Sequence, residues 1–235
     1  MSLPAAKPGG RPELPKSAGS GRPKPTDSGS FGRAVADAPQ ENAFAPGAAV
    51  SCVLKLTKTD STQSTARFLA EQGAQDMTLV WAEAQTNGRG RMKRVWNSEK
   101  GGLYISLILR PKFPPERLAE LSLATASAAA AAISKYAAVE TFVKPPNDVY
   151  ARPTSNSKMK IAAKGAKKIC GILAEASGDS RRVDWLVLGI GVNVNNTPRL
   201  KTACSLKSLT GKWWDVSTVL RSFLAEFKPA YESLR

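Results

Sequence analysis

The stretch Leu103-Tyr-Ile-Ser-Leu-Ile-Leu-Arg110 has the cleanest alternation of side chains in the chain. A period of two is typical of a β-strand. Working outward from it, similar apolar patterns predict further strands on both sides. They are expected at 50–57, 78–84, 141–144, around 149, 169–176 and 183–189.

Three helices are predicted around these strands. The first covers about 60–73, where a Ser-Thr start precedes a stripe of small apolar residues that ends at a glycine. The second opens on two prolines and covers 114–135. The third begins at Asp215 or Ser217 and carries an apolar stripe along one face. Because strands and helices do not alternate strictly, the order predicts an α+β fold, a mixed β-sheet flanked by helices.

The chain divides into two compositionally different parts. Residues 1–48 hold half of the 16 prolines and few large apolar side chains, so we predict a disordered tail. Residues 49–235 are predicted to form one folded domain. Within that domain, the segment 152–166 is polar and basic without any period, which indicates an inserted loop.

The composition excludes several kinds of site. The 235 residues include 34 Lys or Arg, 19 Asp or Glu and no His, giving a net charge of +15. Without histidine there is no Ser-His-Asp triad, imidazole base or His-ligated metal. The three cysteines lack CxxC spacing, which argues against a disulfide framework or a Cys-based zinc site and favours a reducing compartment. No apolar run approaches the roughly 20 residues of a membrane span, and no signal peptide is apparent, so we expect a cytoplasmic protein.

The densest chemical signal is the glycine- and arginine-rich segment 85–96. Its glycines allow close approach of a ligand to the backbone, and Arg89 and Arg91 can both contact phosphate oxygens. Trp96 offers a flat apolar face for a planar ring. The same residues are also compatible with a nucleic-acid-binding loop or a solvated basic hairpin, and the spacing alone does not decide among these roles.

Five segments in a fixed order resemble the motifs of biotin protein ligases. Asp60–Thr65 resembles the D-S-T-N segment, and 82–91 resembles the Gln-x-x-Gly-Arg-Gly-Arg loop, which is followed by Trp and Ser. Lys144–Asp148 resembles K-W-P-N-D, Lys168–Glu175 resembles K-x-x-G-I-L-x-E, and Gly189–Asn195 resembles a G-x-G-x-N strand. Five matches over 60–195 are far more specific than any one of them.

This resemblance implies an activity and a set of partners. Members of the family join biotin to ATP, forming biotinoyl-5′-AMP and pyrophosphate, and then pass the biotinoyl group to a lysine of a biotin carboxyl carrier protein. Mg²⁺ accompanies ATP, although its ligands cannot be read from this sequence. The resemblance also makes 49–235 a catalytic domain of the biotin/lipoate ligase type. Some members are homodimers, so a homodimer is a further possibility.

The resemblance also assigns roles to individual residues. Lys168, Arg91 and Asp148 are expected to be catalytic, with Lys168 stabilising charge at phosphorus and Asp148 orienting the attacking amine. Biotin binding is expected from Ser61, Thr62, Gln63, Gln85, Gly88, Arg89, Gly90, Arg91 and Lys168. Binding of ATP and the adenylate is expected from Arg89, Arg91, Arg94, Trp96, Asn147, Lys168 and Asn193.

The sequence departs from the family pattern in several places. Pro145 replaces a tryptophan that normally helps to wall the biotin pocket, and Lys93 stands where the family often has glycine. The segment 152–167 lengthens the connection between Asp148 and Lys168. No helix-turn-helix pattern is apparent in 1–48, so DNA binding is not expected. The chain ends just after the last helix, so we expect no C-terminal SH3-like domain.

Several different functions and structural roles remain open. Lipoate and octanoate ligases or transferases share this architecture, although the Gly-Arg-Gly-Arg loop resembles the biotin branch. The chain could instead be a basic nucleic-acid-binding module or an inactive ligase-like protein. Structurally, Ser61 could serve only as a helix cap, Asn147-Asp148 only as a turn, Cys170 as a small core residue, and Gly189 and Gly191 only in close strand packing.

Overall fold

A computed structural model of the chain describes residues 49–154 and 165–235. Its seven strands form one sheet in the order β1-β2-β3-β7-β6-β5-β4. Their bounds are β1 Cys52–Leu56, β2 Thr78–Ala82, β3 Leu103–Leu109, β4 Val139–Lys144, β5 Asp148–Pro153, β6 Lys167–Gly178 and β7 Val183–Val192. β1 and β2 are parallel and all other neighbours are antiparallel, so the sheet is mixed, as predicted. The predicted tail at 1–48 and most of the predicted loop at 152–166 lie outside the described residues.

The helices also match the sequence pattern closely. α2 spans Thr62–Glu71, α3 spans Leu118–Ala137 and α5 spans Val216–Leu234, with Asp215 as the N-cap of α5. Short 3₁₀ turns cover Arg91–Lys93 and Pro115–Arg117. The prediction missed α4, Leu206–Thr210, because five residues are too short to show helical periodicity.

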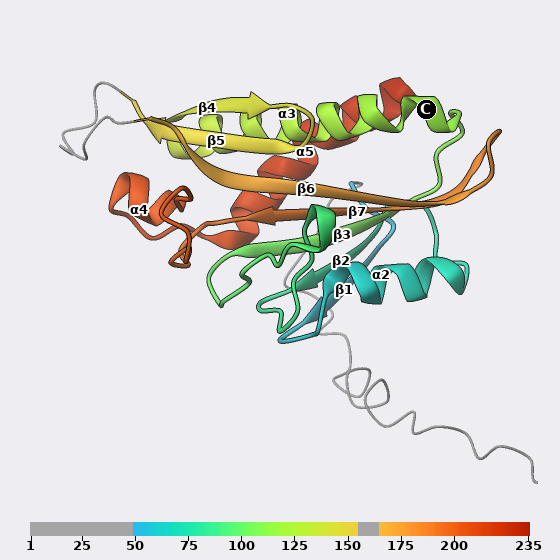
Figure 1. Cartoon of the computed structure of the whole chain (residues 1–235), viewed down its shortest axis with the longest axis horizontal. Coiled ribbons are helices and arrows are strands. Elements are labelled where there is room, and N and C mark those ends of the chain that lie inside the picture. The colour runs from blue at the N-terminus through green and yellow to red at the C-terminus, as the bar shows by residue number, and fades with distance from the viewer. Residues whose placement is uncertain (1–48, 155–164) are drawn as a thin grey trace, which may run out of the picture. The chain divides into compact units, whose positions relative to one another are not determined.

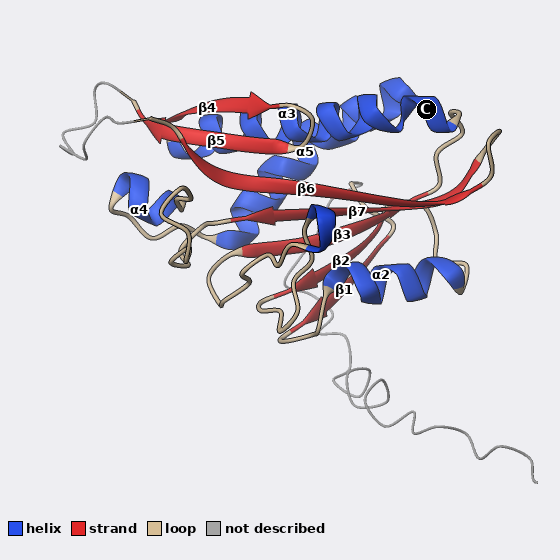
Figure 2. Ribbon diagram, viewed as in Figure 1, coloured by secondary structure: helices blue, strands red, loops and turns tan. Residues whose placement is uncertain are grey.

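The helices cover the two faces of the sheet unequally (Figures 1 and 2). α3 and α5 pack together over one face and form the main core with the odd-numbered residues of β3 and the even-numbered residues of β7. α2 covers part of the opposite face, where Ala66 and Ala70 belong to a second buried apolar cluster with Val80, Ile108 and Val187. The alternation in 103–110 therefore separates a face toward the core from a face toward α2. No helix of the described part of the chain is long and apolar enough to cross a membrane.

Strand register arranges the α2 face in three rows. The row nearest α2 pairs Ile108 with Val187 and Val187 with Glu175. The next row pairs Ser106 with Gly189 and Gly189 with Leu173. The third row consists of Tyr104, Gly191 and Gly171. The two outer rows thus contain Ser106 and three glycines, which leave room above the sheet for a cleft.

Candidate active site

A cleft of about 720 Å³ lies over the two outer rows, and loops that follow several strands wall it. Glycines form its floor. A Cβ atom on Gly189 would stand 2.5 Å from Gln63 Oε1, and one on Gly191 would stand 2.6 Å from Trp96 Nε1. The absence of side chains at these two positions therefore lets Gln63 and Trp96 lie directly on the sheet. This is a more specific role than the close strand packing that the sequence left open.

One end of the cleft is lined by uncharged hydroxyl and amide side chains. Ser61 is the N-cap of α2, and its side chain accepts a hydrogen bond from Gln63 N. Thr62 donates from both its backbone N and its Oγ1 to Gln85 Oε1, at 2.8 and 3.1 Å. Gln85 Nε2 in turn donates to Ser98 Oγ at 2.6 Å. The capping role of Ser61 is thus real, and the cap also brings three predicted binding residues to this neutral end.

Ser106 belongs to the same polar end, and the sequence analysis did not identify it. Its hydroxyl lies 3.0 Å from Thr62 Oγ1 and 3.1 Å from Gln63 Oε1, and the residue is fully buried. Gln63 Nε2 donates to Val187 O at 3.1 Å, so the amide of Gln63 connects Ser106 on β3 with the backbone of β7. The signal that could have identified Ser106 is a single serine among the large side chains of its strand.

The segment 88–96 forms a small hairpin above this floor. Trp96 N donates to Gly88 O and Gly90 N donates to Arg94 O, both at 2.8 Å. At its tip, Lys93 has φ = 60°. This left-handed conformation costs a residue with a Cβ about 1 kcal/mol, which explains why glycine suits the position in the family that the sequence resembles.

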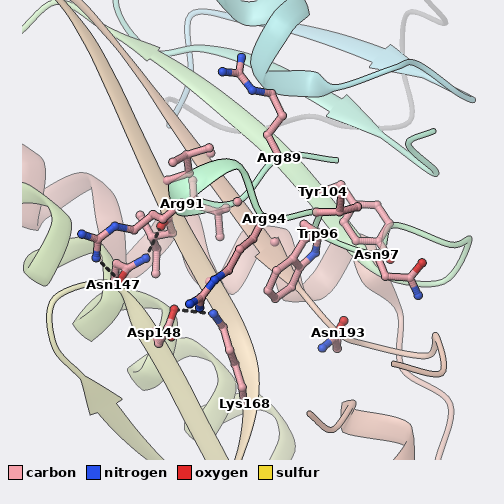
Figure 3. Close-up of a pocket in the computed structure, with 18 of the residues that line it drawn as sticks. Arg89, Arg91, Arg94, Trp96, Asn97, Tyr104, Asn147, Asp148, Lys168 and Asn193 are labelled. Atoms are coloured by element: carbon pink, nitrogen blue, oxygen red, sulfur yellow. Dashed lines mark hydrogen bonds and ion pairs between the residues drawn. The ribbon is translucent and has the colours of Figure 1, made fainter. Parts of the chain in front are cut away.

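The opposite end of the cleft gathers cations around one carboxylate. Lys168 Nζ lies 2.6 Å from Asp148 Oδ1 and 5.4 Å from the centroid of the Trp96 ring. Arg91 Nη1 donates to Asn147 Oδ1 at 2.9 Å. In Figure 3, Arg94 points toward the Lys168–Asp148 pair. Arg91, Asn147, Asp148 and Lys168, which are far apart in sequence and to which the resemblance assigns roles in nucleotide binding or catalysis, therefore meet here.

Arg89 does not join this cationic cluster. Its guanidinium points away from Arg91 and Arg94 (Figure 3), and its Nη2 lies 2.7 Å from Glu175 Oε1 on β6. The resemblance assigned both arginines to the binding of biotin and of ATP. In the hairpin they instead reach two different parts of the sheet, Glu175 and the turn at Asn147.

The segment after β7 forms the wall next to Lys168. The backbone of Lys168 bonds to Thr202 O and to Cys204 N, which fixes this wall against the start of β6. Asn193 is buried, and its Oδ1 accepts from Asn196 Nδ2 at 2.9 Å. Asn193 thus lines the cleft but uses part of its amide to shape the turn that follows β7.

The structure also places the remaining residues that the sequence analysis singled out. Gly88, Gly90 and Asn147 stay in or beside the hairpin, and Pro145 lines the cleft. Cys170 is a core residue, and burial raises the pKa of its thiol to about 12, so it is no nucleophile. Among residues 49–154 and 165–235, no three His, Cys, Asp or Glu side chains come together as a metal site.

The fold and the cleft define a class of protein: a mixed-sheet domain in which a neutral polar pocket leads into a cationic one. The model of the biotin/lipoate A/B protein ligase family matches residues 51–193. The chain belongs to that family.

Individual relatives point to the biotin branch. The chain is 39% identical over 178 residues to the bifunctional ligase/repressor BirA of Bacillus subtilis, covering 73% of this chain and 51% of that protein. It is 34% identical over 145 residues to the biotin–[acetyl-CoA-carboxylase] ligase of Paracoccus denitrificans, covering 61% of this chain and 55% of that protein. The chain thus spans about half the length of the curated relatives it matches.

Solved structures support the same fold. The biotin protein ligase of Aquifex aeolicus, in complex with biotin and ATP, superposes with a TM-score of 0.64 at 33% identity, covering 78% of this chain and 71% of that one. The biotin protein ligase of Leishmania major, in complex with biotinyl-5-AMP, gives 0.61 at 22% identity, covering 78% and 75%. At that identity the second likeness concerns the fold alone.

Proposed function

We propose that this chain is an ATP-dependent biotin ligase, which forms biotinoyl-5′-AMP and transfers biotin to a lysine of a biotin carboxyl carrier protein. The observation that carries the proposal is the division of one cleft into a neutral polar end and a cationic end. An uncharged, polar ureido ring matches the first, and a carboxylate next to a triphosphate matches the second.

The neutral end favours biotin over lipoate or octanoate. Ser61, Thr62, Gln85 and Ser106 place hydroxyl and amide groups around it. A ureido group can exchange hydrogen bonds with such groups, whereas a fatty acyl chain has no polar atom to offer them and a dithiolane ring has only weakly accepting sulfur atoms. The relatives named above are biotin ligases, which agrees with this choice.

The cationic end supports the first half-reaction. A biotin carboxylate oxygen attacks the α-phosphorus of ATP, the bond to the β-phosphate oxygen breaks, and pyrophosphate leaves with the bonding electrons. We propose that Arg91, Arg94 and Lys168 offset the charges of the two anions and the charge that develops at phosphorus. Trp96 and Asn193 would line the nucleotide part of the cleft. Any Mg²⁺ would arrive with ATP.

In the second half-reaction the carrier lysine attacks the biotinoyl carbonyl as a neutral amine. A C–N bond forms, AMP leaves with the electrons of the C–O bond, and the nitrogen loses a proton. Among the described residues that line the cleft, Asp148 is the only one with a carboxylate, and it lies 2.6 Å from Lys168. We propose that Asp148 orients the amine and accepts this proton. The chain's net charge of +15 would attract an acidic carrier domain.

The decisive test is ATP–pyrophosphate exchange by purified protein with biotin, lipoate, octanoate or no acid added. We expect exchange only with biotin, and its loss in Lys168→Ala. Lys167→Ala is the matched control, because Lys167 is the adjacent residue of β6 and its side chain is exposed. Exchange with lipoate or octanoate alone would transfer the proposal to those acids. Equal loss of exchange in both lysine variants would show that the effect is not specific to Lys168 and would contradict its proposed catalytic role.

A further inference from the structure

Glu175 has no role in the mechanism above, yet it occupies a costly position. It stands on β6 in the row nearest α2, in register with Val187 and beyond it Ile108. Its side chain is 28% exposed, and its Oε2 is buried with no hydrogen-bond partner among the described residues. A carboxylate beside apolar side chains loses hydration, so it persists only with a compensating partner. That partner is Arg89, at 2.7 Å.

The Arg89–Glu175 pair is one of two anchors of the hairpin at 88–96. Arg91 provides the other by donating to Asn147 Oδ1, and Asn147 Nδ2 donates to Ile172 O at 2.7 Å. The hairpin therefore crosses the cleft with one arginine tied to Glu175 and the next tied to the turn before β5. Between the two anchors, Trp96 packs on Gly171 and Gly191 of the floor.

We infer that Glu175 is a positioning residue, which holds Arg89 and thereby keeps the hairpin in place over the cleft. The inference rests on the proposed function, because that function supplies the two ligands of the cleft, biotin and biotinoyl-5′-AMP. It changes the expected role of Arg89 from a ligand of the carboxylate and phosphate to an anchor of the hairpin. Loss of Glu175 then weakens binding although Glu175 touches neither substrate.

The two roles of Arg89 predict opposite effects of Glu175→Gln. If Arg89 binds the anions, Glu175 competes with them, and neutralising Glu175 leaves binding unchanged or makes it tighter. If Arg89 anchors the hairpin, the same substitution loosens it, and the bound acid escapes faster. Gln is nearly isosteric with Glu, so the variant removes the charge with little change in packing.

The experiment compares wild type, Glu175→Gln, Arg89→Ala and the double variant. Glu140→Gln is the matched control, because Glu140 forms a similar ion pair with Arg152 across β4 and β5, outside the cleft lining. Calorimetry measures biotin affinity, and a chase with excess biotin measures release of preformed biotinoyl-5′-AMP. Hydrogen exchange of the amides at 88–96 is followed without any substrate.

We expect Glu175→Gln to weaken biotin binding about tenfold and to accelerate adenylate release similarly, as for loss of one charge-assisted hydrogen bond. The double variant should be no worse than Arg89→Ala, and Glu140→Gln should match wild type. Unchanged or tighter binding in Glu175→Gln overturns the inference. If wild type itself binds no biotin, the proposed function fails. Hydrogen exchange then still tests whether Glu175 anchors the hairpin. Unchanged exchange at 88–96 in Glu175→Gln would overturn that role.

Discussion

Gly191 sets how closely Trp96 approaches the floor of the cleft. An alanine Cβ there would stand 2.6 Å from Trp96 Nε1 and 2.7 Å from Cε2, so the indole would have to move. The ring also lies beneath Lys168 Nζ, at 5.4 Å from its centroid. Displacement of the indole therefore disturbs the cationic end of the cleft as well.

We expect Gly191→Ala to lower biotin-dependent exchange by about a hundredfold, the range of a misplaced positioning group. The melting temperature should change much less, because the third row lies outside the core. The matched test uses Trp96→Phe, which lacks the atoms that clash. Gly191→Ala should cost little when added to Trp96→Phe, and an additive loss in the double variant would rule out the clash as the cause.

The three cysteines should differ sharply in reactivity. Cys52 is exposed, whereas burial raises the pKa of both Cys170 and Cys204 to about 12. Because the thiolate is the reactive form, iodoacetamide at about pH 8 should label one thiol in the native protein and three after denaturation. Peptide mass spectrometry identifies the site. Rapid native labelling of Cys170 would contradict the core position assigned to it.

The sequence located most of the residues that line the cleft, but it does not show how the side chains of Arg89 and Arg91 are oriented. The motif Gly88–Arg91 located the hairpin, and its spacing predicted that Arg89 and Arg91 can both contact phosphate oxygens. The hairpin's own backbone bonds separate their side chains, and this geometry depends on β6 and the turn at Asn147, which local sequence does not encode. Ser106 escaped notice for a related reason, since its partners Thr62 and Gln63 are more than 40 residues away.

At the scale of elements, α5 begins at a cap whose strength depends on pH. Asp215 accepts from Thr218 Oγ1 at 2.6 Å and from the backbone N of Ser217 and Thr218, each at 3.1 Å. These bonds, led by that of the Thr218 hydroxyl, lower the pKa of Asp215. Because the folded-state pKa is depressed, the stabilisation is complete above the unfolded-state value of about 4 and is lost as pH falls through the lower folded-state value.

Asp215→Ala should therefore lower the free energy of unfolding by about 1 kcal/mol at neutral pH, the usual cost of losing an N-cap. The difference from wild type should shrink as the pH falls below 4. Urea denaturation at a series of pH values measures it. Asp215→Asn keeps an acceptor for the helix N–H groups and serves as the control. A difference that does not vary with pH would show that the carboxylate charge plays no part.

Periodicity predicted the long elements well because each buries one continuous stripe or face. The boundaries of α3 and α5 follow their apolar stripes, and β3 follows its alternation. The short α4 depends on a capping box in which Ser205 and Ser208 bond reciprocally. That pattern is local and polar, so hydrophobic periodicity does not detect it.

At the scale of the whole molecule, the order of the strands brings the site together. β3 lies next to β7, and β7 next to β6, although about 75 residues of chain separate β3 from β7 in sequence. Only this pairing places Ser106, Gly189 and Leu173 in one row. Hydrophobic patterns show that strands exist but not which strands pair, so the rows of the cleft floor could not be predicted from the sequence.

Asp76 connects the C-terminal helix α5 to the first half of the domain. Its Oδ1 accepts from Arg110 N at 2.7 Å and from the Tyr231 hydroxyl at 2.9 Å, and its Oδ2 lies 3.1 Å from Arg235 Nη1. Tyr231 is buried, and burial raises its pKa well above the ordinary value, so the hydroxyl remains a donor throughout the usual pH range.

Asp76→Ala should destabilise the protein by about 2–4 kcal/mol, because it leaves two largely buried donors without an acceptor. Tyr231→Phe removes one donor together with its need for a partner and should cost about 1 kcal/mol. Asp184→Ala, which breaks only the exposed pair with Arg182, should cost less than about 1 kcal/mol. Urea denaturation ranks the three variants. If Asp76→Ala cost no more than Asp184→Ala, the link through Asp76 would contribute no more to stability than an exposed ion pair.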